Sequence, residues 1–211
     1  MTESVMNLEI EIKLQLGSFT NYLKLTGFLG PIDSEEHQIN GYYDSEDRRL
    51  SKAGWALRVR IMEDRGQVTL KGVSASRGTA VIRQELEADI PHSFALEVLN
   101  LKKDVFDIEA PPVEFVKKEF PEVSLARQVK FSNIRQKKQF KIGDYFYTLE
   151  IDRTEFFDGS VDYELEVELD EADQVEVVQD SLQKLFVSLD IPFVTQGKSK
   201  YQRALEHAGM V

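Results

Sequence analysis

Charged and apolar residues alternate without interruption in the sequence LEIEIKL at residues 8–14. Successive side chains of a β-strand point to opposite faces, so Glu9, Glu11 and Lys13 share one face and the apolar residues share the other. Two carboxylates beside an ammonium group can hold a divalent cation and contact a phosphate at the same time. An ordinary strand with one face in water shows the same alternation, and the stretch is informative because the rest of the chain repeats it.

Strand-like alternation occurs in eight segments of the chain. They are Leu8–Leu16, His37–Asp44, Trp55–Met62, Gln67–Val73, Ala80–Ile90, Val129–Ile142, Tyr145–Thr154 and Val161–Leu169. Turn-forming sequences separate several of them, including DRG at 64–66, IGD at 142–144 and DGS at 158–160. Eight strands joined by short turns favour an antiparallel barrel or sandwich.

Apolar residues at helical spacing lie between and after these strands. The clearest stripe is in Asp173–Leu189. Phe94, Val98, Leu101 and Val105 predict a second helix, and the double proline at 111–112 is expected to open a third. Weaker helical candidates cover Ser18–Phe28 and Ser199–His207. We expect a single domain over residues 1–211, with a helical insertion at about 91–127 between two strands.

The helices indicate which face of the sheet is apolar. If their apolar stripes pack on the outside of a barrel, the outer face is the apolar one and the charged face points inward, the reverse of a common small barrel. Burying many ionised groups is costly unless they pair, bind metal or stay hydrated, so such a lumen is suited to a charged ligand. We therefore predict an α+β fold, an eight-stranded antiparallel β-barrel that forms a tunnel with a charged lumen and helices packed outside.

The charge and composition restrict the partners. The 26 basic and 37 acidic side chains give a net charge of −11, and such a surface repels nucleic acid and anionic membranes, so neither is expected as a partner. The absence of cysteine excludes disulfides, thiolate zinc sites and a cysteine nucleophile. No signal peptide or membrane-spanning run is recognisable, so a cytoplasmic protein is expected. The oligomeric state stays open.

Two acidic clusters and a basic set form the candidate site. The clusters are Glu9 with Glu11, and Asp152 with Glu164 and Glu166. Carboxylates from separate strands can hold one or two Mg²⁺ ions, and solvated sheet edges show the same pattern. Arginine forks match phosphate oxygens, and lysine adds a point charge. The basic candidates are Lys13, Arg58, Arg60, Lys71, Arg83, Arg135, Lys137, Lys198 and Lys200, of which Lys137 and Lys198 taken singly are also typical of scattered surface charge.

The order of these residues along the chain resembles the CYTH superfamily, the triphosphate tunnel metalloenzymes. Glu9-x-Glu11-x-Lys13 is similar to the opening motif of that family, and the resemblance extends to about residue 203. The later motifs that resemble those of the family are YDS at 43–45 followed by Leu50, GWALRVR at 54–60, TLKG at 69–72, RQELE at 83–87, LEID at 149–152, YELE at 163–166 and SKY at 199–201.

The resemblance implies a closed or nearly closed eight-stranded tunnel, a small triphosphate substrate and Mg²⁺ or Mn²⁺ as cofactor. It implies that the substrate is bound by Lys13, Arg58, Arg60, Lys71, Arg83, Arg135, Lys137 and Lys200, with Arg135 and Lys137 able to exchange roles. It implies that the metal is bound by Glu9, Glu11, Asp152, Glu164 and Glu166. Catalysis would then depend on Glu9, Glu11, Glu85 and Glu87, the last two positioning a metal-bound water or orienting the basic residues.

Three functions stay open on the sequence. The favoured one is a metal-dependent hydrolase of a triphosphate compound, with inorganic tripolyphosphate as substrate. The second is a class IV-type adenylate cyclase that converts ATP to cyclic AMP and pyrophosphate. The third is a non-catalytic binder of polyphosphate or nucleotide, which would not need both acidic clusters.

Trp55 bears on the choice of substrate. It is either a platform that stacks a base or thiazole ring or a core residue. In the mammalian thiamine triphosphatases of the family, a tryptophan lies two residues before the matching arginine, whereas Trp55 lies three before Arg58. An odd offset points the side chain to the opposite face of a regular strand, which argues against thiamine triphosphate.

Overall fold

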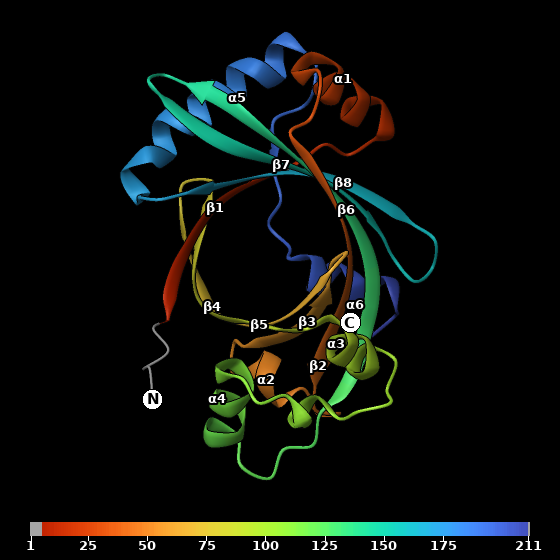
Figure 1. The fold of residues 1–211 in the computed structure, drawn as a ribbon. Coiled ribbons are helices and arrows are strands. Elements are labelled where there is room, and N and C mark those ends of the chain that lie inside the picture. The colour runs from red at the N-terminus through yellow and green to blue at the C-terminus, as the bar shows by residue number, and fades with distance from the viewer. Residues whose placement is uncertain (1–5, 211) are drawn as a thin grey trace.

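The structure is a computed structural model that describes residues 6–210, apart from the side chains of residues 73, 74 and 77. Its sheet closes into a barrel in the strand order β5-β4-β3-β2-β6-β7-β8-β1, because β1 also pairs with β5 (Figure 1). All pairings are antiparallel, as predicted. The strands are β1 (Asn7–Gln15), β2 (Ser34–Asp44), β3 (Ala56–Ile61), β4 (Arg65–Arg77), β5 (Ala80–Pro91), β6 (Ala126–Ile142), β7 (Tyr145–Glu155) and β8 (Val161–Leu169).

The eight predicted strands are all present, and the structure adds a short ninth. This strand, β9 (Val194–Thr195), pairs with the end of β1 at Leu14 and Gln15. Two residues are too few to show alternation, so sequence periodicity could not have found it. The pairing ties the segment before the C-terminal helix to the end of β1.

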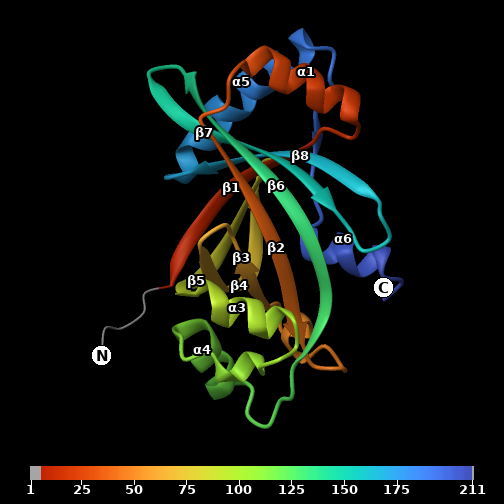
Figure 2. The ribbon, with the colours of Figure 1, turned by 45° about the vertical axis from the view of Figure 1, so that its right-hand side comes forward.

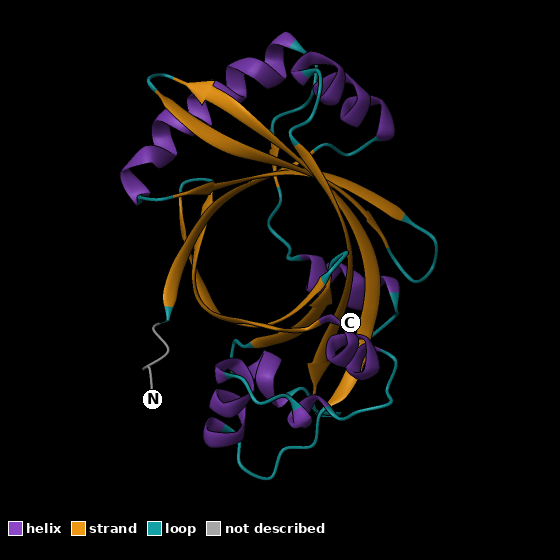
Figure 3. Cartoon of the chain, in the orientation of Figure 1, coloured by secondary structure: helices purple, strands orange, loops and turns teal. Residues whose placement is uncertain are grey.

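The charged faces of the strands point inward and the apolar faces point outward, as predicted. In β1, Ile12 and Leu14 are completely buried under helices, while Glu11 and Lys13 line the lumen. The helices other than the C-terminal one lie outside the ring of strands, and the C-terminal helix is seen through the opening of the ring (Figure 3). The barrel is therefore inverted relative to a common small barrel, with its apolar layers between strands and helices.

Helices cover the barrel on two opposite sides (Figure 1). On one side, α1 (Phe19–Leu29) and α5 (Val175–Ser188) pack Leu25 and Phe186 against the outer faces of β1, β7 and β8. On the other side, α3 (His92–Leu99) and α4 (Pro111–Glu119) pack Val98 and Val113 against β3, β4 and β5. A four-residue helix, α2 (Arg49–Lys52), follows β2. No helix in the described part of the chain is long and apolar enough to cross a membrane.

The prediction of one helix running through Leu101 to Val105 is wrong. The helix α3 ends at Leu99, and Leu101 has a positive φ of 58° and is 64% exposed. Val105 belongs instead to a separate 3-10 helix, Val105–Asp107, which Asp104 caps by accepting a hydrogen bond from the Phe106 amide. Leu101, in the left-handed conformation, turns the chain after α3 and ends the helix. The helical spacing of Leu101 and Val105 with Val98 is therefore a coincidence of sequence.

The C-terminal helix α6 (Lys200–His207) lies beside β6 (Figure 2), and it packs against Val129 and Phe131 near the start of that strand. It begins with a capping box in which the Ser199 hydroxyl accepts from the Gln202 amide and the Gln202 side chain accepts from the Ser199 amide. This cap fixes the first turn, where Lys200 is buried and lines the lumen. Tyr201 stacks on Tyr42 of β2 with ring centroids 4.5 Å apart. The weak helical signal at 199–207 is thus confirmed.

Candidate functional site

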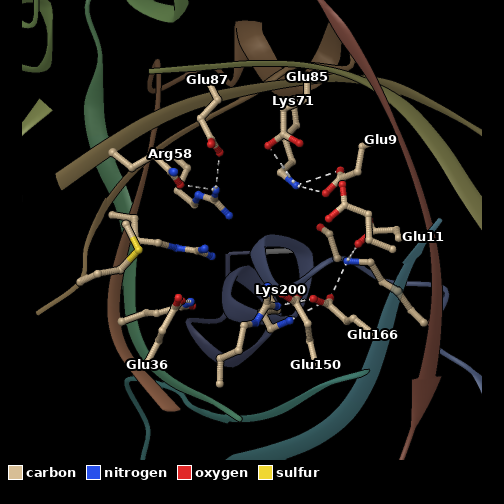
Figure 4. Close-up of a pocket in the computed structure, with 18 of the residues that line it drawn as sticks. Glu9, Glu11, Glu36, Arg58, Lys71, Glu85, Glu87, Glu150, Glu166 and Lys200 are labelled. Carbon is tan, nitrogen blue, oxygen red and sulfur yellow. Dashed lines mark hydrogen bonds and ion pairs between the residues drawn. The ribbon is translucent and has the colours of Figure 1, made fainter. Parts of the chain in front are cut away.

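The lumen contains a cavity of about 300 Å³ whose walls are almost entirely charged or polar (Figure 4). Every strand of the barrel contributes to it, because one residue in two along each strand faces inward. Of the residues predicted for the site, those that line the cavity are Glu9, Glu11, Lys13, Arg58, Arg60, Lys71, Arg83, Glu85, Glu87, Arg135, Lys137, Glu166 and Lys200. Asp152 and Glu164 are fully buried in the wall behind them.

The first acidic cluster lies where β1 pairs with β5 and closes the barrel. Glu9 is the register partner of Arg83, whose Nε donates to Glu9 Oε2 at 2.6 Å. Lys71 Nζ donates to Glu9 Oε1 at 2.7 Å and also contacts Glu85 at 3.3 Å. Glu11 pairs with Arg83 and, at 3.2 Å, with Lys13. Burial raises the pKa of the Glu9 carboxyl, but Lys71 and Arg83 outweigh burial and hold it well below its usual range.

The second acidic cluster, Asp152, Glu164 and Glu166, brings together carboxylate oxygens from β7 and β8. One oxygen of each residue lies within 4.8 Å of the others. Lys200 reaches in from α6, and its Nζ lies 2.7 Å from Asp152 Oδ2 and 2.9 Å from Glu166 Oε1 and contacts Glu164 as well. Part of the negative charge of the cluster is therefore balanced by an ammonium group that comes from outside the barrel sheet.

Arg135 of β6 completes this network from the other side. Its Nε donates to Asp152 Oδ1 at 2.8 Å, and its guanidinium also contacts Glu150 and Glu166. Burial raises the pKa of the Asp152 carboxyl, but Arg135 and Lys200 together outweigh burial and hold the pKa below its usual range, so the group stays ionised. For Glu166, Lys13 and Lys200 similarly outweigh burial and hold the pKa well below its usual range.

Arg58 and Arg60 differ from the other buried cations of the lumen, because within the described residues neither has a carboxylate oxygen close to its guanidinium. Arg58 donates to Thr69 Oγ1 at 2.9 Å, and its nearest carboxylate, Glu87, is 3.9 Å away. Arg60 Nε donates to the amide oxygen of Asn40 at 2.7 Å. Burial first, and then repulsion from Arg58 and Arg135, lower the pKa of Arg60 to about 9, so it remains protonated at neutral pH.

Sequence reasoning missed several residues of the cavity wall. Glu36, Glu150 and Glu168 line the cavity, as does Tyr42. Burial and then repulsion from Glu9, Glu150 and Glu85 raise the pKa of Glu168. For Glu150 and Glu168 the signal was available, since each shares the inward face with a predicted site residue two positions away, whereas β2, which carries Glu36 and Tyr42, contains no predicted site residue.

Two other basic or aromatic candidates lie outside the cavity. Lys198 is exposed, does not line the lumen and pairs with Glu206 at 2.7 Å. Trp55 precedes β3 and packs against Phe115 of α4, with ring centroids 4.8 Å apart, in the apolar layer outside the barrel. Trp55 is therefore a core residue, and it cannot stack on a ligand in the lumen.

The donor set of the lumen fits a hard divalent cation. All the candidate ligands are carboxylate oxygens, which Mg²⁺ and Mn²⁺ prefer, and the described residues contain one buried trio, Asp152, Glu164 and Glu166, close enough to share an ion. Glu11 and Glu166 present carboxylates to the cavity itself. In the structure these oxygens are paired with Lys13, Lys200 and Arg135, so a cation can bind only where those side chains find other partners.

The buried ion pairs predict a loss of stability in acid. Glu9, Asp152 and Glu166 have folded-state pKa values below their ordinary values of 4.5, 3.8 and 4.5. Their stabilisation is complete above those ordinary values and is lost as the pH falls below about 4 towards the folded values. We expect Tm, measured by thermal unfolding, to fall as the pH is lowered from about 4.5 to about 2, and less steeply in Glu9→Gln. A Tm that is constant over this range would contradict the pairing.

The closed antiparallel barrel, with its lumen lined by cations and carboxylates, places this chain among the proteins that form a tunnel with a charged lumen. The chain is a member of the CYTH family, since the CYTH domain matches residues 7–196. The sequence resemblance is thereby confirmed. A search of curated proteins finds no match.

Solved structures share the whole fold. HpAC1 from Hippeastrum, a candidate adenylyl cyclase described as revealing a dominant triphosphatase activity, is 25% identical with a TM-score of 0.80, covering 96% of this chain and 97% of its own. A candidate adenylate cyclase from Bacillus halodurans is 22% identical with a TM-score of 0.71, covering 94% of this chain and 98% of its own. PH1819 from Pyrococcus horikoshii is 20% identical with a TM-score of 0.62, covering 94% and 99%. The last two support the fold alone.

Proposed function

We propose that this protein is a metal-dependent hydrolase of triphosphate compounds, with inorganic tripolyphosphate as its substrate. The observation that carries the proposal is the pair Arg58 and Arg60, which face an enclosed cavity without a close carboxylate. A buried cation without a counter-ion is costly, and an anion from solution relieves that cost. The pair is therefore the point at which a phosphate chain is expected to bind first.

The other lumen cations would bind the phosphate chain by exchanging partners. Lys13, Lys200 and Arg135 are each paired with Glu166 in the structure. A triphosphate in the cavity carries more negative charge and more acceptor oxygens than a single carboxylate. Once they turn to the phosphate, Glu166 and its neighbours are free to bind a cation. Substrate and metal are thus expected to assist each other's binding.

Phosphoryl transfer depends on positioning and on neutralising charge, and both are within the capacity of these residues. Arg58, Arg60, Lys71, Arg83 and Lys137 would orient the phosphate chain, and Glu85 and Glu87 would orient Lys71 and Arg58. Glu9, Glu11, Asp152, Glu164 and Glu166 would hold Mg²⁺ or Mn²⁺, which stabilises charge on the phosphoryl oxygens and lowers the pKa of an attacking water.

An adenylate cyclase that makes cyclic AMP from ATP is the second candidate, and the likeness to HpAC1 favours it, because that protein is named as a candidate adenylyl cyclase. The same description gives HpAC1 a dominant triphosphatase activity, which supports the hydrolase. Most residues of the cavity wall are charged, and Trp55 lies outside it, so tripolyphosphate is preferred over a nucleotide or thiamine triphosphate.

One assay separates the candidates. The purified protein is incubated with tripolyphosphate, thiamine triphosphate or ATP, each with Mg²⁺, with Mn²⁺ or with a chelator, and both phosphate and cyclic AMP are measured. We expect phosphate release from tripolyphosphate that requires the metal. Cyclic AMP as the main product from ATP would select the cyclase instead. Tight binding of all three compounds without any product would contradict both enzyme functions.

A further inference from the structure

Tyr42 and Tyr43 are neighbours on β2 and place their hydroxyl groups in opposite environments. Tyr43 points outward, where its hydroxyl donates a hydrogen bond to the Val98 carbonyl of α3 at 3.0 Å. Tyr42 points inward and lines the cavity, although it is only 8% exposed. Among the described residues, no group accepts from or donates to the Tyr42 hydroxyl within hydrogen-bonding distance. The hydroxyl oxygen is accessible from the cavity, so a ligand in the lumen could accept a hydrogen bond from it.

The ring of Tyr42 is held rigidly between aromatic neighbours. It stacks on Tyr201 of α6 with ring centroids 4.5 Å apart and planes 5° apart, and on Phe131 of β6 at 5.9 Å. Tyr201 itself directs its hydroxyl away to Ser51, 3.4 Å distant. The stack fixes where the Tyr42 hydroxyl points, so a ligand group that meets it does so without a loss of side-chain freedom.

The surroundings of the hydroxyl are cationic. Tyr42 is the register partner of Arg58, so the two side chains lie side by side on the lumen face. Burial raises the pKa of the phenol, but the lumen cations, Arg58 first among them, outweigh burial and lower it. A phenol that is polarised by neighbouring cations is a stronger hydrogen-bond donor than an ordinary one.

We propose that the Tyr42 hydroxyl is a further substrate-binding group, which donates a hydrogen bond to a phosphoryl oxygen of the triphosphate held by Arg58. This inference rests on the proposed function, because it assumes that a phosphate chain occupies the cavity. Tyr42 thereby adds a neutral donor beside Arg58, and it fixes the orientation of the phosphate there.

The test compares Tyr42→Phe with Tyr43→Phe, a matched pair that removes one hydroxyl from either face of the same strand. Binding of inorganic tripolyphosphate to each metal-free protein is measured by calorimetry, and KM and kcat are measured with Mn²⁺. We expect Tyr42→Phe to weaken binding and raise KM by about 10-fold, the effect of one hydrogen bond to a charged group, with an unchanged Tm because the ring stack is kept. Tyr43→Phe should lower Tm and leave KM unchanged.

A spectroscopic reading is independent of turnover. A new hydrogen bond to a phenol changes its ultraviolet absorption, so pyrophosphate added to the metal-free protein should give a tyrosine difference spectrum that is absent in Tyr42→Phe. Equal affinity, KM and difference spectrum in wild type and Tyr42→Phe would overturn the inference while leaving the hydrolase proposal intact. Failure of the wild-type protein to bind or hydrolyse tripolyphosphate would overturn the proposed function, and the inference with it.

Discussion

Replacing Glu11 by glutamine is expected to lower kcat for tripolyphosphate by about 100-fold or more while the protein remains folded. Glu11 is 5% exposed and presents its carboxylate to the cavity, so the substitution removes one charged oxygen from the set proposed to hold Mg²⁺ or Mn²⁺. The fold should tolerate the change, because both cations that contact Glu11 keep a second carboxylate. Arg83 keeps Glu9, and Lys13 keeps Glu166 at 2.8 Å.

The matched control is Glu35→Gln, which removes the same charge from the outer face of β2, where Glu35 accepts from Gln136. Its kcat should equal that of the wild type. Steady-state kinetics and a Mn²⁺ titration followed by electron paramagnetic resonance would be measured on both variants. Near-normal kcat and Mn²⁺ affinity in Glu11→Gln would show that the first strand does not bind metal.

Replacing Arg58 by alanine is expected to raise KM for tripolyphosphate by about 10- to 100-fold, the range for losing charge-assisted hydrogen bonds to phosphate. Folding should persist, because Arg58 holds no carboxylate closer than 3.9 Å and its loss leaves no buried anion without a partner. The effect should lie mainly in KM, because Arg58 is proposed to bind the substrate rather than to act only in the transition state.

Two further variants sharpen this test. Arg58→Lys keeps the charge but loses the planar fork, and we expect it to recover part of the affinity. Arg153→Ala removes a cation from the outer side of β7, where Arg153 pairs with Glu155 at 3.3 Å, and it should leave KM unchanged. If Arg58→Ala and Arg153→Ala raised KM equally, the effect would reflect net charge and not a phosphate contact.

Much of the fold was predictable from the sequence because strand alternation and helical spacing are local properties of the chain. The alternation in β1 indicates which face of the strand is apolar, since Glu9, Glu11 and Lys13 share one face and Ile10 and Ile12 the other. The apolar stripes of the helices indicate that helices cover this apolar face. Together they indicated an inverted barrel. The break after Leu99 was missed, because apolar spacing does not reveal a left-handed residue at Leu101.

The sequence by itself determined the residue types of the lumen, since a period of two assigns every second residue of each strand to the same face. Only the tertiary structure decided which charges meet. The closing pair β1–β5 sets Glu9 opposite Arg83, the pairing of β1 with β8 sets Lys13 opposite Glu166, and α6 delivers Lys200 into the second acidic cluster. These contacts join residues far apart in the chain, and their register follows from how the strands align around the barrel and not from any local pattern. For the same reason, only the tertiary structure shows that Arg58 and Arg60 are buried in the lumen without a close carboxylate.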